Sequence, residues 1–188
     1  MPKGRGDRQD LNRGTRRPRR ATLLAVLAFT PAALGQSGGD ACPAHLFVVE
    51  RSKNANIVAY DANRGPAGDF RSSEPVVVYW LLNGQADKRE ELNRVERDRA
   101  YGVEVTPGDH PGTYFLVFKA DGKRRLNVST LDGCPVTTTT IDGRNGILRK
   151  LFVKSKEDSV LPKVEYVEFF GKSVDTGEPI YEKFFPGR

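Results

Sequence analysis

Several residue types that function predictions usually rely on are scarce in this chain of 188 residues, which has two Cys, two His, one Trp and one Met. Isolated cysteines and histidines do not form the clustered sets that zinc sites use, so no metal site and no cofactor is expected. The motifs H-E-x-x-H, G-x-x-x-x-G-K-[ST], G-x-G-x-x-G and C-x-x-C are absent. These absences favour a non-enzyme, although a triad assembled from distant residues leaves catalysis open.

A basic excess is also missing from most of the chain. The net charge is +6, but residues 1–20 alone hold eight basic and two acidic side chains, and the remaining 22 basic and 22 acidic residues cancel. A protein that binds nucleic acid needs a basic surface, so we expect no nucleic-acid partner.

Long hydrophobic runs are missing except at residues 21–34, ATLLAVLAFTPAAL. Fourteen residues at ~1.5 Å each cover ~21 Å, which is short of the ~30 Å hydrocarbon core, so no stable membrane span is expected after processing. A basic stretch (1–20), a short apolar run and small residues are typical of a secretory signal peptide over residues 1–35. The sequence thus predicts an exported protein, periplasmic or extracellular. Thr22 favours general secretion, and Arg19-Arg20 keeps twin-arginine export as the alternative.

The two cysteines, Cys42 and Cys134, both follow the expected cleavage point. Disulfides persist in exported proteins, and a bridge closing so long a loop contributes roughly 4 kcal/mol in the chain-entropy model. We expect a disulfide, with two free thiols as the alternative.

The expected mature chain consists of a linker (36–44) and a single domain (45–188) made of short runs rich in Val, Ile, Thr, Phe and Tyr. Asp-Gly and Asn-Gly pairs, which suit tight hairpin turns, separate the runs at 121–122, 132–133, 142–143 and 145–146. Residues 113–154 are therefore predicted to form a four-strand meander. The fold class is all-β, a mainly antiparallel sandwich or barrel of about ten short strands. The strands are predicted at 45–52, 56–61, 76–82, 101–105, 113–120, 124–130, 136–141, 147–154, 164–170 and 179–185.

One gap between the runs is long enough for a helix. Asp87 and Glu90 have the spacing of a capping box, Glu90 and Arg94 are four residues apart, and Leu92 and Val95 would share a face. The pattern predicts one short amphipathic helix near 88–99. The run 76–82 is apolar throughout, which indicates a central strand covered on both faces.

Strand alternation places single charges on mostly apolar faces, because residues two apart point the same way. Glu50, Asp61 and Lys119 lie near strand ends, where water reaches them. Arg149 shares a predicted face with Ile147, Leu151 and Val153, and Glu168 shares one with Tyr166 and Phe170. A buried unpaired charge is costly, so these two either pair with each other or contact a ligand.

The loop Glu50–Asn56, ERSKNAN, concentrates polar groups between the first two strands. Such a loop on a rigid sheet is typical of binding sites, and an ordinary hairpin tip is the alternative. Trp80 either stacks on a flat ligand or packs in the core.

Four blocks of the chain resemble a bacterial family known as domain of unknown function 4833: His45–Asn63 (HLFVVERSKNANIVAYDAN), Pro75–Leu82 (PVVVYWLL), Glu96–Val103 (ERDRAYGV) and Tyr166–Phe184 (YVEFFGKSVDTGEPIYEKF). The resemblance covers about 45–185 and implies an exported bacterial protein, without catalytic residues to carry over. It draws attention to the polar residues of these blocks.

These observations favour a non-catalytic envelope protein that binds a small molecule or a cell-envelope glycan. A hydrolase with paired carboxylates such as Glu50 and Glu168, and a structural or interaction protein, are the alternatives. The oligomeric state is left open. The candidate binding residues are Glu50, Arg51, Asn54, Asn56, Asp61, Arg97, Tyr101, Arg149 and Glu168.

The small residues before Gln36 predict cleavage after Gly35. N-terminal sequencing of the protein from the envelope fraction should therefore begin at Gln36. A chain that keeps residues 1–35, or begins far from Gln36, would contradict the predicted signal peptide.

Overall fold

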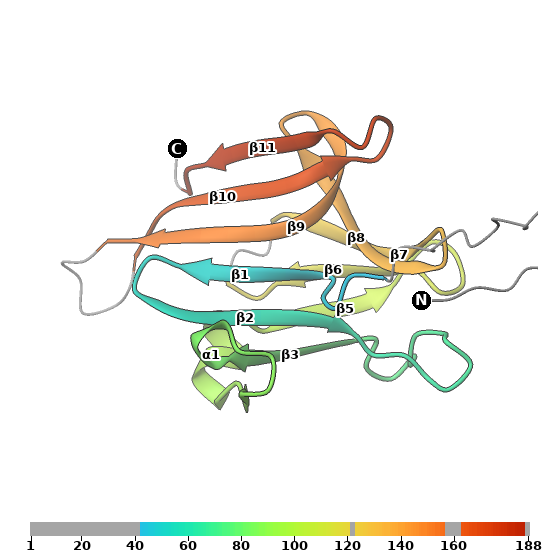
Figure 1. The fold of residues 1–188 in the computed structure, drawn as a ribbon, viewed down its shortest axis with the longest axis horizontal. Helices are drawn as coiled ribbons and strands as arrows, with labels where there is room; N and C mark the ends of the chain where they lie inside the picture. The colour runs from blue at the N-terminus through green and yellow to red at the C-terminus, as the bar shows by residue number, and fades with distance from the viewer. Residues whose placement is uncertain (1–41, 121–122, 157–162, 187–188) are drawn as a thin grey trace, which may run out of the picture. The chain divides into compact units, whose positions relative to one another are not determined.

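The runs rich in β-branched and aromatic residues form strands, and the turn residues between them reverse the chain. The computed structural model describes residues 42–120, 123–156 and 163–186, which contain eleven strands, a short 3₁₀ turn, η1 (Leu82–Gly84), and one helix, α1 (Arg94–Arg99) (Figure 1). The expected all-β class with one short helix is confirmed. The strands are β1 (Phe47–Arg51), β2 (Asn54–Ala62), β3 (Val76–Leu81), β4 (Arg89–Glu91), β5 (Val103–Pro107), β6 (Tyr114–Phe118), β7 (Arg125–Leu131), β8 (Cys134–Ile141), β9 (Arg144–Ser155), β10 (Val164–Ser173) and β11 (Pro179–Phe184).

Strand β9 joins two parts of the sheet, one made of β1–β4 and the other of β5–β8. The strand order is β4-β3-β2-β1-β9-β8-β7-β6-β5, and β10 pairs with β9 and β11. The first residues of β9 pair with β8, residues Lys150–Val153 pair in parallel with β1, and β10 follows its other edge. The predicted meander over 113–154 is present as β6 to β9. The sheet curls at β9, so that β1–β3 lie in front of β5–β7 (Figure 1).

A β-bulge marks the point where β9 changes partner. Phe170 and Gly171 are adjacent in β10, yet they pair with Lys150 and Leu148, which leaves Arg149 as the extra residue. The bulge shifts the alternation, so that Leu148 and Leu151 both enter the core although they are three residues apart. The predicted shared face of Ile147, Arg149, Leu151 and Val153 is therefore wrong.

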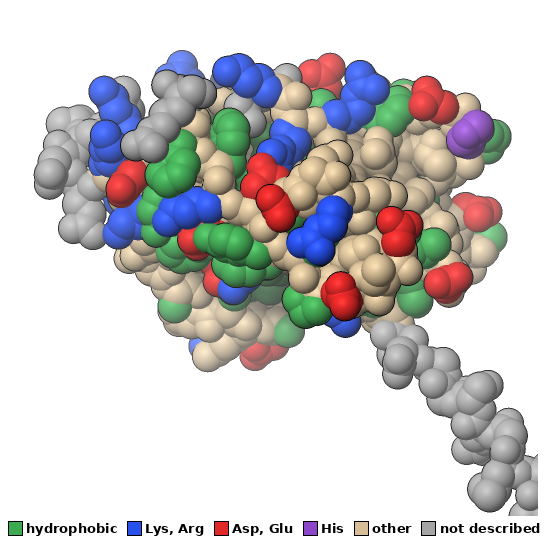
Figure 2. Space-filling model, turned by 90° about the horizontal axis from the view of Figure 1, so that it is seen from above, with side chains coloured by type: hydrophobic (Ala, Val, Ile, Leu, Met, Phe, Trp, Pro, Cys, Tyr) green, Lys and Arg blue, Asp and Glu red, His purple; other side chains and the backbone are tan. Residues whose placement is uncertain are grey.

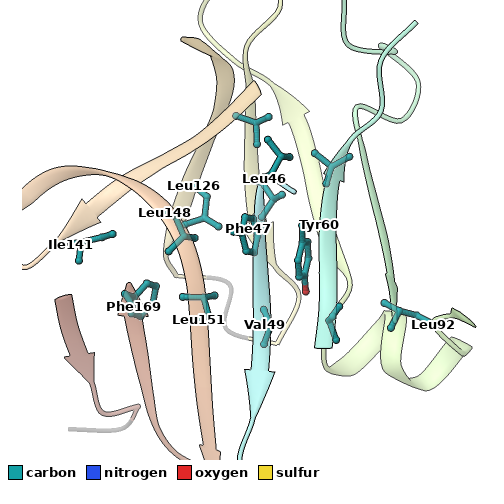
Figure 3. Close-up of a cluster of buried hydrophobic side chains, with 14 of the residues drawn as sticks. Leu46, Phe47, Val49, Tyr60, Leu92, Leu126, Ile141, Leu148, Leu151 and Phe169 are labelled. Carbon is teal, nitrogen blue, oxygen red and sulfur yellow. The ribbon is translucent and has the colours of Figure 1, made fainter. Parts of the chain in front are cut away.

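The main core lies on the inner side of the curl. Phe47 of β1 stacks on Tyr60 of β2 with ring centres 4.3 Å apart, and Phe118 of β6 meets the Phe47 ring edge-on. Figure 3 shows Leu148, Leu151 and Phe169 joining this cluster from β9 and β10. Because the cluster draws on both parts of the sheet, its burial holds the curl together.

A second, smaller cluster of Ala59, Tyr79 and Leu81 forms apart from the main core. Trp80 of β3 belongs to the main cluster. Strand β3 thus packs on both faces as predicted, but it lies next to the edge strand β4 rather than in the centre of the sheet.

Two of the four predicted turns have the expected backbone. Asp132-Gly133 and Asp142-Gly143 all have positive φ, between 50° and 79°, as two-residue hairpin turns require. Asp121-Gly122 lies outside the described residues. The turn at Asn145-Gly146 was predicted wrongly: both residues belong to β9, because the chain has already reversed at Asp142-Gly143.

The helix predicted near 88–99 is also wrong at its start. Residues Arg89–Glu91 form the edge strand β4 beside β3, and α1 begins only after Asn93, whose side chain caps it together with Glu96. Leu92 is buried while Val95 is exposed, so these two do not share a face. With no buried residue, α1 is not amphipathic.

The structure contains a Cys42–Cys134 disulfide with Cα atoms 5.3 Å apart, which ties the segment before β1 to the start of β8. The predicted signal peptide (1–35) and residues 36–41 of the predicted linker lie outside the described residues. Within the described ranges, helices are too short and too polar to cross a bilayer.

The Thr137 hydroxyl of β8 is fully buried and has no hydrogen-bond partner within the described part of the chain. Thr137→Val removes this unpaired group at similar volume, so the free energy of unfolding in urea should rise by about 1 kcal/mol. Thr138→Val, at the half-exposed neighbouring position, is the matched control and should change it by less than about 0.5 kcal/mol. A loss of stability in Thr137→Val would contradict the unpaired hydroxyl.

Candidate functional site

Arg51, the last residue of β1, lies at the centre of a polar cluster on the inner face. Its guanidinium carbon lies 4.5 Å from the centre of the Trp80 ring and 5.5 Å from that of Tyr101. Nη1 donates to the Tyr101 hydroxyl at 2.9 Å, and Nη2 donates to Asn54 Oδ1 at 3.1 Å. Contact with two aromatic rings and two fixed acceptors holds the cation in one place.

The third nitrogen of Arg51, Nε, is buried and has no hydrogen-bond partner among the described residues. A buried donor without an acceptor costs about 1–3 kcal/mol, and more when it is charged. One donor of the cluster is therefore left without an acceptor.

Trp80 connects β3 to the start of helix α1. Its Nε1 donates to Glu96 Oε2 at 3.0 Å, and the same oxygen accepts from the Asn93 backbone N–H at 3.0 Å. Asn93 Oδ1 in turn accepts from the Glu96 backbone N–H at 2.9 Å. The capping box thus fixes the Glu96 carboxylate beside Trp80.

Two tyrosines close the inner side of the cluster. The buried Tyr60 hydroxyl donates to the Tyr101 carbonyl at 2.7 Å. Burial, and to a smaller extent the charge of Tyr101, raises the pKa of Tyr60 well above its usual value. Burial also raises the pKa of Tyr101, although the charge and hydrogen bond of Arg51 oppose this. Both hydroxyls therefore stay protonated near neutral pH.

A hollow of about 290 Å³ opens over this cluster, and we call it the Arg51 hollow. Three segments that are separate in the sequence form it: the β1–β2 hairpin, β3 with η1, and β4 with the start of α1. Among the described residues of its lining, three carboxylates outnumber one guanidinium, which favours neutral or cationic ligands over anions. The lining residues are Arg51, Asn54, Asn56, Trp80, Leu82, Glu90, Glu91, Asn93 and Glu96.

Comparison of the sequence with models of protein families gives a match. The model described as domain of unknown function (DUF4833) matches residues 47–183. The chain belongs to this family. The matched DUF4833 region runs from β1 into β11 and includes the whole Arg51 hollow. Neither the comparison with curated proteins nor that with solved structures gave a match.

Four of the candidate binding residues meet in this part of the DUF4833 domain. Arg51, Asn54 and Asn56 line the hollow, and Tyr101 contacts Arg51. Asn56 Oδ1 accepts from the Asn83 backbone N–H at 3.0 Å, which ties β2 to η1. Arg97 lies close by on α1, but it donates to the Leu92 carbonyl and faces Glu91 at 3.8 Å instead of lining the hollow.

Three other candidates of the DUF4833 domain lie elsewhere. Glu50 pairs with Lys150 at 3.1 Å, and Glu168 accepts from Tyr181 at 2.8 Å and faces Lys183 at 3.7 Å. Arg149 lies at the β9 bulge with Nη1 buried and without a partner in the described ranges. The expected alternative of an Arg149–Glu168 ion pair is therefore wrong. Basic, acidic and hydrophobic side chains are interspersed on the face shown in Figure 2.

The remaining candidate, Asp61, binds two neighbours on the other face of β2. His45 Nδ1 and the Tyr79 hydroxyl lie 2.5 Å from its two carboxylate oxygens. Burial, the hydrogen bond to Asp61 and the charge of Asp61 raise the pKa of Tyr79, so Tyr79 remains a donor. Both oxygens of Asp61 are thus occupied by groups that join β2 to β3 and to the segment before β1.

The two carboxylates suggested for a hydrolase lie on different strands and have different partners. Glu50 and Glu168 both stand opposite Phe152, one on each side of β9, so two strand spacings, about 10 Å, separate their backbones. Each faces a lysine, and neither lines the Arg51 hollow.

Two important side-chain pairs of the DUF4833 domain were missed from sequence. The spacing of Asn93 and Glu96 is a capping signal, but the earlier Asp87–Glu90 pair masked it. Arg124 and Glu182 form two hydrogen bonds across 58 positions, and the Glu182 carboxylate also accepts from the Asp142 backbone N–H at 2.9 Å. No local pattern indicates such a distant pair.

The Arg124–Glu182 pair predicts how the free energy of unfolding depends on pH. Partial burial alone would raise the pKa of Glu182, but the hydrogen bonds from Arg124 and Asp142 and the Arg124 charge lower it below its usual 4.5. The ionised group therefore stabilises the fold above about pH 4.5, and this stabilisation is lost as the pH falls through the lowered pKa. Glu182→Gln should cost about 1 kcal/mol at pH 7 and reduce the acid dependence of the free energy of unfolding.

Exposed Glu104 offers the matched control, because Glu104→Gln should leave both quantities unchanged. Equal acid dependence in the wild type and Glu182→Gln would show that the pair contributes nothing.

Proposed function

We propose that this DUF4833 protein is a non-catalytic binding module of the cell envelope that holds a small polyhydroxylated molecule, such as the end of a short glycan, in the Arg51 hollow. One observation carries the proposal: three separate segments of the chain bring Arg51 and several amide and carboxylate groups to one hollow. The Arg51 guanidinium is held at its base by Trp80 and Tyr101.

The chemistry of the lining favours this ligand class. Asparagine amides both donate and accept hydrogen bonds, glutamates accept, and Arg51 donates, while a sugar hydroxyl does both. A volume of about 290 Å³ is at the low end of the ~300–1,000 Å³ range of small-molecule sites, so one sugar ring suits it better than a long chain.

Binding is favoured over catalysis by the side chains present. Among the residues that the structure describes, no Ser, Cys or His lines the Arg51 hollow. Glu96, the carboxylate nearest Trp80, already accepts from Trp80 and Asn93. A carboxylate fixed by two hydrogen bonds to one of its oxygens suits recognition better than proton transfer.

Export is part of the proposal. Disulfides persist in oxidising compartments, and the Cys42–Cys134 bridge fits the predicted signal peptide at 1–35. An envelope location gives the hollow access to glycans, and we keep general secretion ahead of twin-arginine export.

Titration calorimetry with the neutral sugars glucose and N-acetylglucosamine tests the site, together with native mass spectrometry of protein from the envelope fraction. We expect at least one sugar to bind and Arg51→Lys to weaken it about tenfold, because lysine keeps the charge but loses the planar fork. Asn54→Ala should weaken it similarly.

Lys53→Ala, an exposed neighbour in the same hairpin, is the control and should bind as the wild type does. Thermal unfolding checks that each variant is folded. Absence of any retained or titrated small molecule, or equal binding by folded Arg51→Lys, would reject the proposal.

A further inference from the structure

A second and larger hollow lies at the end of the curled sheet, away from the Arg51 hollow. It has a volume of about 710 Å³ and is bounded by the residues leading into β7, the end of β8, the β8–β9 turn and strand β11. We call it the Arg124 hollow. Its size falls within the usual range for sites of small organic ligands.

One wall of the Arg124 hollow is fixed. The Arg124 guanidinium makes two hydrogen bonds to Glu182, and its carbon lies 4.0 Å from the centre of the Phe169 ring and 5.6 Å from that of Phe184. Both side chains of the ion pair are only about a quarter exposed or less (26% and 20%). The pair therefore neutralises Glu182 and keeps Phe184 at the wall.

The remaining charge of the lining is positive. The second carboxylate, Asp142, faces Arg144 at 3.7 Å. Lys123 and Arg125 also line the hollow, and in the described part of the chain no carboxylate lies within 4.0 Å of either. Arg125 is instead placed over the Phe115 ring at 4.5 Å. Lys123 and Arg125 thus add positive charge to the lining, with the Arg125 guanidinium over Phe115 rather than Phe184.

We propose that the Arg124 hollow binds a small amphipathic anion, whose acidic head lies between Lys123 and Arg125 and whose apolar body lies against Phe184. Arginine and lysine hold phosphate and carboxylate groups by charge-assisted hydrogen bonds. The Phe184 ring and the aliphatic stems of the basic side chains supply apolar contact. This site differs in charge from the Arg51 hollow, where carboxylates dominate, so the two select different ligands.

Titration calorimetry with four probes that share one alkyl chain tests the site: octyl phosphate, octanoate, octanol and octylammonium. We expect the two anions to bind, octanol to bind about tenfold more weakly, and octylammonium not to bind. Amide shifts in NMR spectra of the disulfide-bonded protein should occur at Thr140, Gly143 and Phe184.

The double variant Lys123→Gln/Arg125→Gln should weaken octyl phosphate about tenfold, while Lys88→Gln/Lys172→Gln, a pair of exposed lysines elsewhere, should not. Preference for octyl phosphate over octanoate would assign the head group as phosphate-like, and the reverse as carboxylate-like.

The proposal is wrong if octanol binds as tightly as the anions, if both double variants lose affinity equally, or if the amide shifts lie at Asn54 and Asn56. These results do not affect the sugar titrations at the Arg51 hollow, so either proposal can be rejected independently of the other.

Discussion

The fold depends on one strand that belongs to both parts of the sheet. Strand β9 pairs with β8 near its start, with β1 further along and with β10 on its other edge, so neither part is complete without it. The bulge at Arg149 lets the strand turn from one partner to the other while Leu148 and Leu151 both remain in the core. Gly171, opposite Leu148, allows close packing there, because a Cβ at this position would lie 2.5 Å from the Ile147 carbonyl oxygen.

The position of the Arg51 hollow follows from this strand. The parallel register sets Arg51 of β1 opposite Val153 of β9, which directs its side chain to the inner face. There it meets Trp80 from β3 and Tyr101 from the segment after α1. The Arg124 hollow depends on β9 as well, since in the described part of the chain the β10–β11 hairpin pairs with the rest of the sheet only through β9.

Strands and two tight turns could be predicted from the sequence because they depend on local patterns. Runs of β-branched residues and Asp-Gly pairs with positive φ need no distant partner. The edge strand β4 could not be predicted, because Arg89–Glu91 are charged and form a strand only where β3 offers them hydrogen bonds. The bulge at Arg149 leaves no local signal either, since it arises from pairing with a strand that follows later in the chain.

The candidate site was predicted in part for the same reason. Asn54 and Asn56 stand out in a polar hairpin, and Arg51 precedes it, so a local pattern found them. Trp80 and Glu96 join them only through tertiary contacts, and the single tryptophan was equally compatible with an ordinary core position. Conversely, Glu50, Asp61 and Glu168 broke the apolar pattern because they lie on the other face of their strands, where each has polar partners.

Native-state hydrogen exchange measured by NMR tests the central role of β9 most directly. If one strand holds both parts together, the core amides of β1–β3 and of β6–β8 should exchange with the same free energy of opening, and those of Leu148 and Leu151 should be among the most protected. A lower free energy of opening for one part, with the other still protected, would show that the two parts unfold independently and would contradict this account.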